Sequence, residues 1–296
     1  MIKIENLHVS FNDKQVLKGL NLHIPSNSIF GFVGKNGAGK TTTTKAILGL
    51  LTANKGSVLV NNEKVVFGGT NTNKYIGYLP DVPEFYPFMT AYEFLLFCAK
   101  LTKMDEEVIK DRVNEMLTLV GLENETHQIN GYSRGMKQRL GIAQALLNKP
   151  KILICDEPTS ALDPIGRKQI LDILKSVSKE TTVLFSTHIL SDVENVCSDV
   201  AFLDDGVIKV CGKLQDIKAK YENQEYTLVL EKQEDVNLLL EKFSFINQTI
   251  NNQLSFYLSN NNLYEVLQFI SLNKISLIKI EKNEPTLESL FMEVIK

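Results

Sequence analysis

Apolar and polar positions follow two different patterns along the chain, and the change falls near Gly212. Before Gly212, three short runs are almost entirely apolar, which is typical of parallel strands that are buried on both faces. These runs occupy residues 28–34, 151–158 and 182–188. Residues 3–11 and 17–24 instead alternate, which predicts a smaller antiparallel sheet beside the first. Helical spacing predicts helices over residues 91–101 and 106–120.

Beyond Gly212 the pattern predicts a second, smaller α+β domain. Glycine-rich turns stop there and asparagine becomes frequent. Strands are expected at residues 225–231, 244–250, 253–258 and 275–281. Helices are expected at residues 234–242, 262–272 and 286–295. We therefore expect two domains, residues 1–212 and residues 213–296.

The composition is that of an ordinary globular protein, with 296 residues, 44% hydrophobic and 23% charged. A net charge of −3 provides no general reason to expect binding to nucleic acid. No apolar run approaches the roughly 18 residues that a membrane-spanning helix needs, and residues 1–11 alternate like a strand and not like a signal peptide. The four cysteines show no metal-ligand spacing and indicate a reduced, cytoplasmic protein. We expect a soluble chain.

The stretch GFVGKNGAGKTT contains the first candidate binding motif of the chain. Gly34, Gly39, Lys40 and Thr41 have the spacing of a P-loop, between a predicted strand and a predicted helix. The glycines let backbone N–H groups converge on phosphate oxygens. Lys40 supplies a positive charge for the β- and γ-phosphates, and the Thr41 hydroxyl is a ligand for Mg²⁺. A glycine turn that only caps a helix is the structural alternative.

Carboxylates follow the second apolar run. KILICDEP places Asp156 and Glu157 at the carboxyl end of a strand, where ligands bind in open α/β sheets. We expect Asp156 to hold Mg²⁺ through its water shell and Glu157 to activate the attacking water as general base. An acidic surface turn ended by Pro158 is the alternative. His188 ends the third run, where it is either structural or placed to stabilise charge on a γ-phosphate.

Residues 131–146 begin with flexible polar positions and continue as a predicted helix. Ser133 and Gly135 stand at its start. They either cap free backbone N–H groups of the helix or form a cradle for an anion. The stretch by itself leaves both interpretations open.

The motifs GKNGAGKT, YSRGMKQR, LICDEP, SALD and STH, in this order, resemble the nucleotide-binding subunit of ABC transporters over residues 2–212. The resemblance implies an α/β P-loop NTPase cassette with a RecA-like parallel core sheet, an antiparallel β subdomain and an α-helical subdomain. It also implies a Mg²⁺-dependent ATPase coupled to transport. Such a subunit works as a homodimer or heterodimer and drives a separately encoded membrane permease from the cytoplasmic, inner face of the membrane.

The resemblance assigns roles to residues one at a time. Phe11 would stack on adenine with Val16 at its side, although a core phenylalanine is the alternative. Thr42 would contact the α-phosphate. Ser133 and Gly135 would close over the γ-phosphate of ATP bound to a second subunit. The other nucleotide contacts would come from the P-loop itself: Gly34, Asn36, Gly37, Ala38, Gly39, Lys40 and Thr41.

The chain also departs from the family. Asp81 stands where a glutamine is usual, but a carboxylate can still ligate Mg²⁺, so Thr41, Asp81 and Asp156 form the expected metal set. Three signature positions differ as well: Tyr132, Arg134 and Met136. Arg134 either adds an ionic contact or points to solvent.

Two further segments have expected roles. Asp163 ends the motif SALD, which resembles the loop that links the two active sites of a dimer. The aromatic residues of segment 81–89 either receive a short helix of the permease or pack under their own loop. The tail beyond Gly212 resembles, loosely, that of export-type ABC ATPases of bacterial drug, bacteriocin and lipid transporters. We expect this tail to support dimerisation or regulation, and a small packing domain is the alternative.

Two other classes of protein fit the sequence less well. Soluble ABC ATPases of translation or DNA repair usually carry two cassettes, coiled-coil insertions or zinc-binding cysteine sets, and none is seen in this sequence. A P-loop kinase has no use for the Ser133–Gly135 helix start. A GTPase would need a guanine-reading Asn-Lys-x-Asp stretch, which the sequence lacks.

Overall fold

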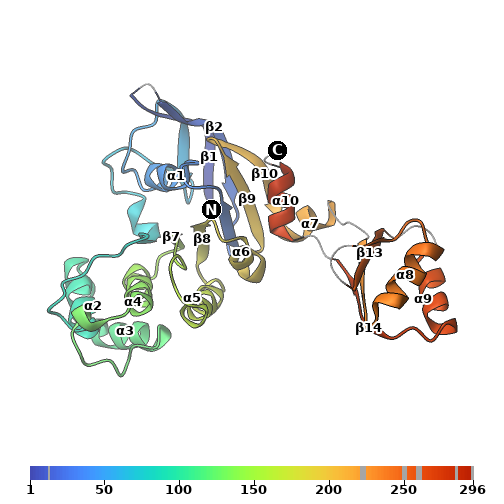
Figure 1. Cartoon of the computed structure of the whole chain (residues 1–296). Helices are drawn as coiled ribbons and strands as arrows, with labels where there is room; N and C mark the ends of the chain where they lie inside the picture. The colour runs from blue at the N-terminus through green and yellow to red at the C-terminus, as the bar shows by residue number, and fades with distance from the viewer. Residues whose placement is uncertain (13, 221–224, 249–251, 258–261, 284–285, 295–296) are drawn as a thin grey trace. The chain divides into compact units, whose positions relative to one another are not determined.

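The computed structural model describes residues 1–12, 14–220, 225–248, 252–257, 262–283 and 286–294. The chain forms two compact units. The first comprises Met1–Gln215 together with Phe291–Lys296, and the second comprises Asp216–Leu290. Among the described residues, the first unit contains two sheets and the second contains one, and each unit has its own hydrophobic core (Figure 1).

A six-stranded sheet forms the centre of the first unit, in the order β10–β9–β3–β8–β7–β6. Its strands are β3 (Ile29–Val33), β6 (Ile76–Leu79), β7 (Ile152–Asp156), β8 (Thr182–Thr187), β9 (Asp199–Asp204) and β10 (Val207–Lys213). All neighbours pair in parallel except β10, which is antiparallel to β9. Every residue of β3, β7 and β8 is buried. The prediction of parallel strands covered on both faces is confirmed.

A second, antiparallel sheet belongs to the same unit, in the order β2–β1–β4–β5. Its strands are β1 (Ile2–Phe11), β2 (Lys14–Ile24), β4 (Lys55–Val60) and β5 (Glu63–Lys64). Ile4 and Leu20 on its inner face share one core with Phe32 of β3 and Ile47 of helix α1 (Lys40–Ile47). This shared core holds the end of β1 close to the start of α1. The predicted antiparallel sheet is confirmed.

Three helices gather at one end of the first unit: α2 (Ala91–Leu101), α3 (Glu106–Leu119) and α4 (Arg134–Leu146) (Figure 1). A capping box of Thr90 and Glu93 begins α2. The predicted helices at 91–101 and 106–120 are confirmed to within one residue. Two more helices follow the strands of the central sheet, α5 (Pro164–Val177) and α6 (Leu190–Val196). Single 3₁₀ turns lie at Asn73–Tyr75 and Ile129–Gly131.

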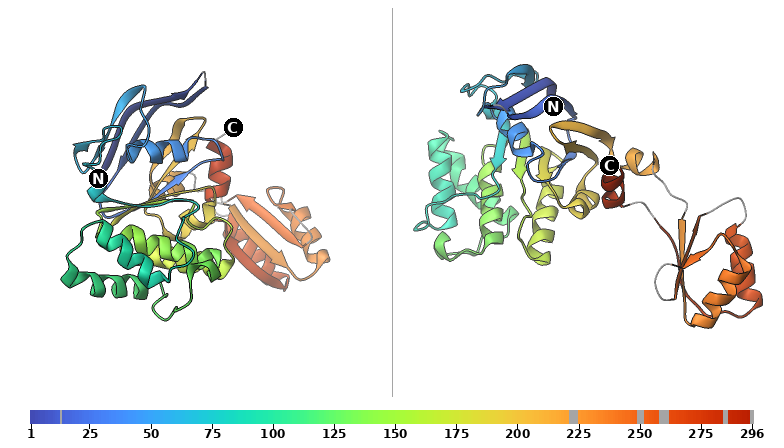
Figure 2. Two further views of the ribbon diagram at one scale, coloured as in Figure 1. Left: turned by 90° about the vertical axis from the view of Figure 1, so that its left-hand side faces the viewer. Right: turned by 45° about the horizontal axis from the view of Figure 1, so that its top comes forward.

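The second unit is built on an antiparallel sheet in the order β12–β13–β11–β14. Its strands are β11 (Glu225–Leu230), β12 (Asn247–Gln248), β13 (Gln253–Tyr257) and β14 (Leu277–Lys282). Helices α8 (Gln233–Lys242) and α9 (Asn262–Leu272) cover one face of this sheet (Figure 2). Leu228, Leu254 and Phe256 of the sheet are buried against them. Helix α7 (Leu214–Lys220) precedes these elements in the chain and α10 (Leu287–Val294) follows them.

The predicted strand at residues 244–250 is wrong for most of its length. Phe243 and Ile246 are both buried although they are three positions apart, and the Ile246 N–H donates to the Phe243 carbonyl at 3.2 Å. The chain therefore turns there, and β12 keeps only two residues, while 249–250 lie outside the described part. The other predicted elements of the tail are confirmed to within two residues. Their expected ends at residues 258 and 295 also lie outside the described part.

Candidate nucleotide-binding site

The loop between β3 and α1 is shaped by its glycines. Gly37 and Gly39 have φ angles of 83° and 113°, in the region that favours glycine. A Cβ atom on Gly39 would lie 2.7 Å from Leu17 Cδ2, and one on Gly34 would lie 2.6 Å from the Leu203 carbonyl oxygen. Side chains at these two positions would push the loop away from the sheet. The loop thus keeps its backbone at the start of α1, where N–H groups can bind an anion.

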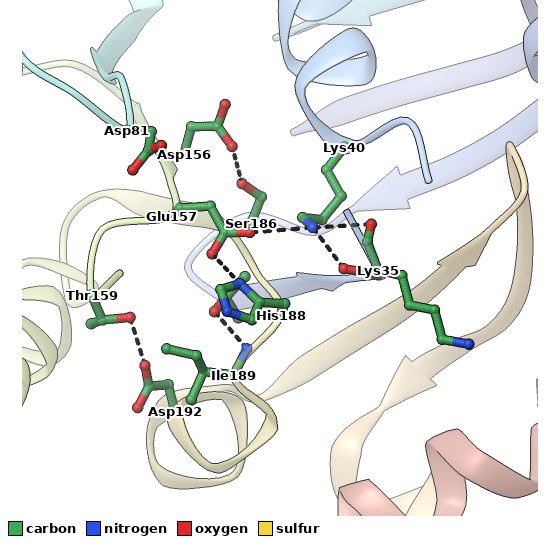
Figure 3. Close-up of polar contacts among 12 residues, drawn as sticks. Lys35, Lys40, Asp81, Asp156, Glu157, Thr159, Ser186, His188, Ile189 and Asp192 are labelled. Atoms are coloured by element: carbon green, nitrogen blue, oxygen red, sulfur yellow. Dashed lines mark hydrogen bonds and ion pairs between the residues drawn. The ribbon is translucent and has the colours of Figure 1, made fainter. Parts of the chain in front are cut away.

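Lys40, the first residue of α1, points back along this loop (Figure 3). Its side chain is only 6% exposed. Its Nζ donates to the Gly34 carbonyl at 2.6 Å and lies 3.2 Å from Glu157 Oε1. A buried ammonium group is tolerated because a carbonyl and a carboxylate face it. Lys40 therefore places a positive charge between the glycine loop and the acidic residues after β7.

A hydroxyl and a carboxylate meet beside Lys40. Thr41 Oγ1 donates to Asp156 Oδ2 at 3.0 Å, and the Ser186 hydroxyl donates to Asp156 Oδ1. Asp156 is buried at the last position of β7. Hard oxygen ligands of this kind suit Mg²⁺. The donor set at the end of β7 therefore fits the expected metal.

Glu157 follows Asp156 and leaves the strand sharply. Its φ angle of 49° lies in the left-handed region, which costs a glutamate on the order of 1 kcal/mol. The Glu157 backbone N–H donates to the Ser186 carbonyl at 3.0 Å. Its Oε2 lies 2.8 Å from His188 Nδ1, so the carboxylate stands between Lys40 and His188 (Figure 3). Lys40, Glu157 and His188 come from three separate segments of the sequence, and the structure brings them together.

One open cavity collects most of the predicted nucleotide contacts. It is lined by Phe11, Val16, Asn36, Gly37, Gly39, Lys40, Thr41, Thr42, Asp81, Asp156 and Glu157. Phe11 is 52% exposed, so the alternative of a core phenylalanine is wrong. Gly34 and Ala38 shape the loop from behind, where Ala38 is buried. Two further lining residues, Lys14 and Lys35, were not expected. Lys35 lies inside the glycine loop and Lys14 lies between Phe11 and Val16, so their places in these segments are the signal that could have identified them.

Ser133 and Gly135 lie apart from this cavity, at the start of α4. The Ser133 hydroxyl accepts from the Met136 N–H at 3.2 Å, so it caps the helix within its own chain. Neither residue is among those that line the cavity in the part of the chain that the structure describes. Asp163 also caps a helix, because its side chain accepts from the Gly166 N–H at the start of α5.

Two of the departures from the family pattern meet in space. Arg134 Nη2 lies 3.5 Å from Asp81 Oδ1, although 53 positions separate them in sequence. Burial raises the pKa of the Asp81 carboxyl, and the neighbouring Arg134 opposes that rise. Gln138 also donates to the Asp81 carbonyl at 2.7 Å. Arg134 thus makes the ionic contact that the sequence left open.

Comparison with known proteins finds relatives among ATP-binding subunits of ABC transporters. A family model described as ABC transporter matches residues 17–160. A second model, described as the C-terminal domain of DrrA1-3-like ATP-binding proteins, matches residues 212–295. The ABC transporter ATP-binding protein YxlF of Bacillus subtilis is 44% identical over 77% of this chain and 76% of its own length. The bacitracin transport ATP-binding protein BcrA of Bacillus licheniformis is 34% identical over 100% of this chain and 97% of its own length.

A solved structure is also similar. It is described as the dimeric, post-hydrolysis state of an ATP-binding cassette bound to ADP and Pi. It has 27% sequence identity and a TM-score of 0.63, covering 72% of this chain and 99% of that one. These likenesses do not favour a soluble ATPase of translation or DNA repair. The chain belongs to the ABC transporter family, as an ATP-binding subunit that hydrolyses ATP to power transport.

Proposed function

We propose that Glu157 is the general base of this ATPase and that the chain drives export through a separate membrane permease. The observation that carries the proposal of a general base is the position of the Glu157 carboxylate. Its two oxygens lie 3.2 Å from Lys40 Nζ and 2.8 Å from His188 Nδ1, at the mouth of a glycine loop. A carboxylate held in this way can accept a proton from a water molecule beside a bound phosphate.

The other residues at this site are proposed to bind the phosphates, Mg²⁺ and adenine. Lys40 binds the β- and γ-phosphate oxygens, and His188 holds the Glu157 carboxylate and faces the developing charge. Thr41 and Asp156 hold Mg²⁺, with Asp81 as a further carboxylate at the edge of the cavity. When bound, Mg²⁺ neutralises charge on the β- and γ-phosphates. The exposed Phe11 ring offers a flat apolar surface for adenine.

The first prediction concerns the metal. Asp156→Asn should raise the Mg²⁺ concentration needed for half-maximal ATPase activity by about tenfold, because an amide replaces a charged partner of the metal. Titrating Mg²⁺ at saturating ATP measures this shift. Asp172→Asn is the matched control, since Asp172 is an exposed carboxylate on α5. An unchanged Mg²⁺ requirement in the Asp156 variant would remove this residue from the metal site.

We further propose that each ATP is bound between two subunits. Ser133 and Gly135 lie at the amino end of α4, where backbone N–H groups and the helix dipole favour an anion. The phosphate loop of the same chain is part of a separate cavity. A second subunit can supply this helix end, as homodimer or heterodimer. The dimeric cassette bound to ADP and Pi supports the idea for a similar fold.

The surface for the permease is proposed at segment 81–89. Tyr86 and Phe88 are exposed, whereas the Phe85 ring packs edge-on against Phe94 of α2 at 5.0 Å. Tyr86 also packs edge-on against Phe97 of α2 at 5.6 Å, although about half of its side chain stays exposed. The segment thus fits both interpretations in part: the Phe85 and Tyr86 rings pack on α2, and Tyr86 and Phe88 still present aromatic surface. No helix among the described residues is long and apolar enough to cross a bilayer. A permease that receives these side chains would hold the subunit at the inner face of the membrane.

The direction of transport is proposed from the full-length similarity to BcrA, which is named for bacitracin transport. Its match extends through the second unit of this chain, as does the DrrA-like model. We therefore propose export of a bacterial drug, a peptide antibiotic or a lipid. The second unit would support the dimer or regulate it, because every residue assigned to phosphate, metal or water precedes Ile189.

The second prediction tests the permease surface. A photo-crosslinking residue at Tyr86 or Phe88 should capture a multi-spanning membrane protein in native membranes, because both side chains are exposed. The same probe at Phe85 is the matched control and should capture much less. Mass spectrometry of the crosslinked band identifies the partner. Equal capture from all three positions, or none from any, would place the permease contact elsewhere.

A further inference from the structure

Two contacts join the turn after β7 to the segment after β8, and the proposed mechanism uses only one of them. The first is the pair of Glu157 and His188. In the second, Thr159 Oγ1 donates to Asp192 Oδ2 at 2.6 Å (Figure 3). Thr159 is 0% exposed and Asp192 is 1% exposed. A carboxylate so deeply buried has a specific partner in place of water.

The surroundings of Asp192 give it little compensation beyond that hydroxyl. Burial raises the pKa of its carboxyl, and the Thr159 hydrogen bond and the charge of Arg167 oppose the rise. Arg167 Nε lies 3.8 Å from Asp192 Oδ1, which is too long for a hydrogen bond. Among the described residues, that Nε has no hydrogen-bond partner. The Thr159 hydroxyl is therefore the short contact that orients the Asp192 carboxylate.

Asp192 stands on a firmly placed helix. Its neighbour Val193 is 0% exposed and packs directly on β3, where a Cβ atom on Gly31 would lie 2.8 Å from Val193 Cγ1. No larger residue fits there without moving α6, so the helix lies close against the sheet. The position of the Asp192 carboxylate is consequently set by the core.

The turn that carries Glu157 has left-handed backbone angles at two positions. Glu157 and Ala161 both have positive φ angles, of 49° and 53°. The turn is closed by the hydrogen bonds from Ser160 N–H to the Glu157 carbonyl at 3.1 Å and from Leu162 N–H to the Thr159 carbonyl at 3.4 Å. Left-handed residues persist only when their surroundings hold them. The hydrogen bond from Thr159 to Asp192 attaches the turn to the neighbouring helix α6 and so helps to hold these backbone angles.

We infer that Asp192 is a positioning residue, which fixes the turn after β7 through the Thr159 hydroxyl and so holds the Glu157 carboxylate in place against His188. The inference rests on the proposed role of Glu157. Neither Thr159 nor Asp192 lines the cavity beside the glycine loop, so their contact does not touch the residues that are proposed to bind the phosphates. Loss of the contact should therefore slow hydrolysis without weakening ATP binding.

The test compares Asp192→Asn, Thr159→Val, Thr159→Ser and the Thr159→Val/Asp192→Asn double variant in steady-state ATPase assays of the full chain. We expect kcat to fall by about ten- to a hundredfold in the first two variants, the range that a small misplacement of a catalytic group produces. Valine removes the hydroxyl, and the asparagine amide has to turn its NH2 group toward either Thr159 or Arg167, neither of which can pair with it as it does with the carboxylate. KM for ATP should stay within about twofold of wild type. Thr159→Ser keeps the hydroxyl and should keep the rate. The double variant should be no slower than the slower single variant, because the two side chains form one contact.

The controls separate this inference from the assignment of the base. Asp172→Asn controls for a generic Asp-to-Asn change on the surface, and Glu157→Gln is the reference for loss of the base. A wild-type kcat in Asp192→Asn beside an inactive Glu157→Gln would overturn only the positioning role. A wild-type rate in Glu157→Gln would instead overturn the proposed function.

Three other results would also overturn the inference. They are a higher KM at unchanged kcat, losses that multiply in the double variant, and equal rates in Thr159→Val and Thr159→Ser. If Asp192→Asn does not fold, the comparison of valine with serine at Thr159 decides alone. A slow valine variant beside a normal serine variant then supports the role.

Discussion

Glu157→Gln should lower the steady-state ATPase rate by about a hundredfold or more, the usual contribution of a general base. Glutamine has nearly the shape of glutamate and can still contact Lys40 and His188, but it cannot accept a proton from water. ATP binding should persist, because the glycine loop and Lys40 are untouched. Phosphate release at saturating Mg-ATP measures the rate, and a fluorescent ATP analogue measures binding.

The controls for this variant are straightforward. Asp172→Asn should hydrolyse ATP at the wild-type rate. A Glu157→Gln protein that turns over like wild type would show that another group activates the water. A protein that loses ATP binding as well would show that Glu157 supports the cavity and not the chemistry.

Lys40→Ala should lose both tight ATP binding and hydrolysis. The Lys40 ammonium is the buried positive charge between the Gly34 carbonyl and the Glu157 carboxylate. Removing one preorganised charge that faces the transferred phosphoryl group typically slows catalysis by about 10²–10³-fold. Nucleotide titration and phosphate release, done on the same preparation, measure the two losses.

Lys45→Ala is the matched control for this prediction. Lys45 lies on the same helix and is exposed, so its removal changes the net charge equally without touching the cavity. We expect wild-type binding and turnover from it. Equal losses in the two variants would indicate a general charge effect, and wild-type activity in Lys40→Ala would contradict the phosphate-binding role.

The parts of the fold that the sequence predicted well depend on local signals. The helix at 91–101 begins where Thr90 and Glu93 form a capping box and continues with apolar residues at helical spacing. The glycine loop is readable because Gly37 and Gly39 need backbone angles that other residues avoid. Asp156 was readable because a wholly apolar strand leads up to it. Each of these signals lies within a dozen residues.

The parts that could not be predicted depend on contacts between distant segments. Arg134 meets Asp81 only because α4 is packed beside the end of β6. Asp192 looks like an ordinary first-turn acid of a helix, and only the packing of α6 on β3 buries it against Thr159. The turn at residues 243–246 was not predicted, because the apolar residues of this segment do not by themselves distinguish a turn from a strand. Periodicity does not carry this information.

In the proposed dimer, ATP is bound between two subunits, with the phosphate loop of one and the Ser133–Gly135 helix end of the other. Gly135→Asp separates the two contributions. A Cβ atom at Gly135 would meet only Leu162 and Ser133 atoms at 3.9 Å, so the isolated chain has room for the aspartate side chain. In a dimer, however, its carboxylate would face the γ-phosphate and repel it.

The most direct measurement is the mass of the Glu157→Gln protein by size-exclusion chromatography with light scattering, with and without Mg-ATP. We expect a shift from one chain of 33.3 kDa to twice that mass when Mg-ATP is added. We also expect Gly135→Asp in the same background to bind ATP and to stay at the mass of one chain. A Glu157→Gln protein that is saturated with ATP and remains monomeric, or a Gly135→Asp variant that dimerises equally well, would contradict the shared site.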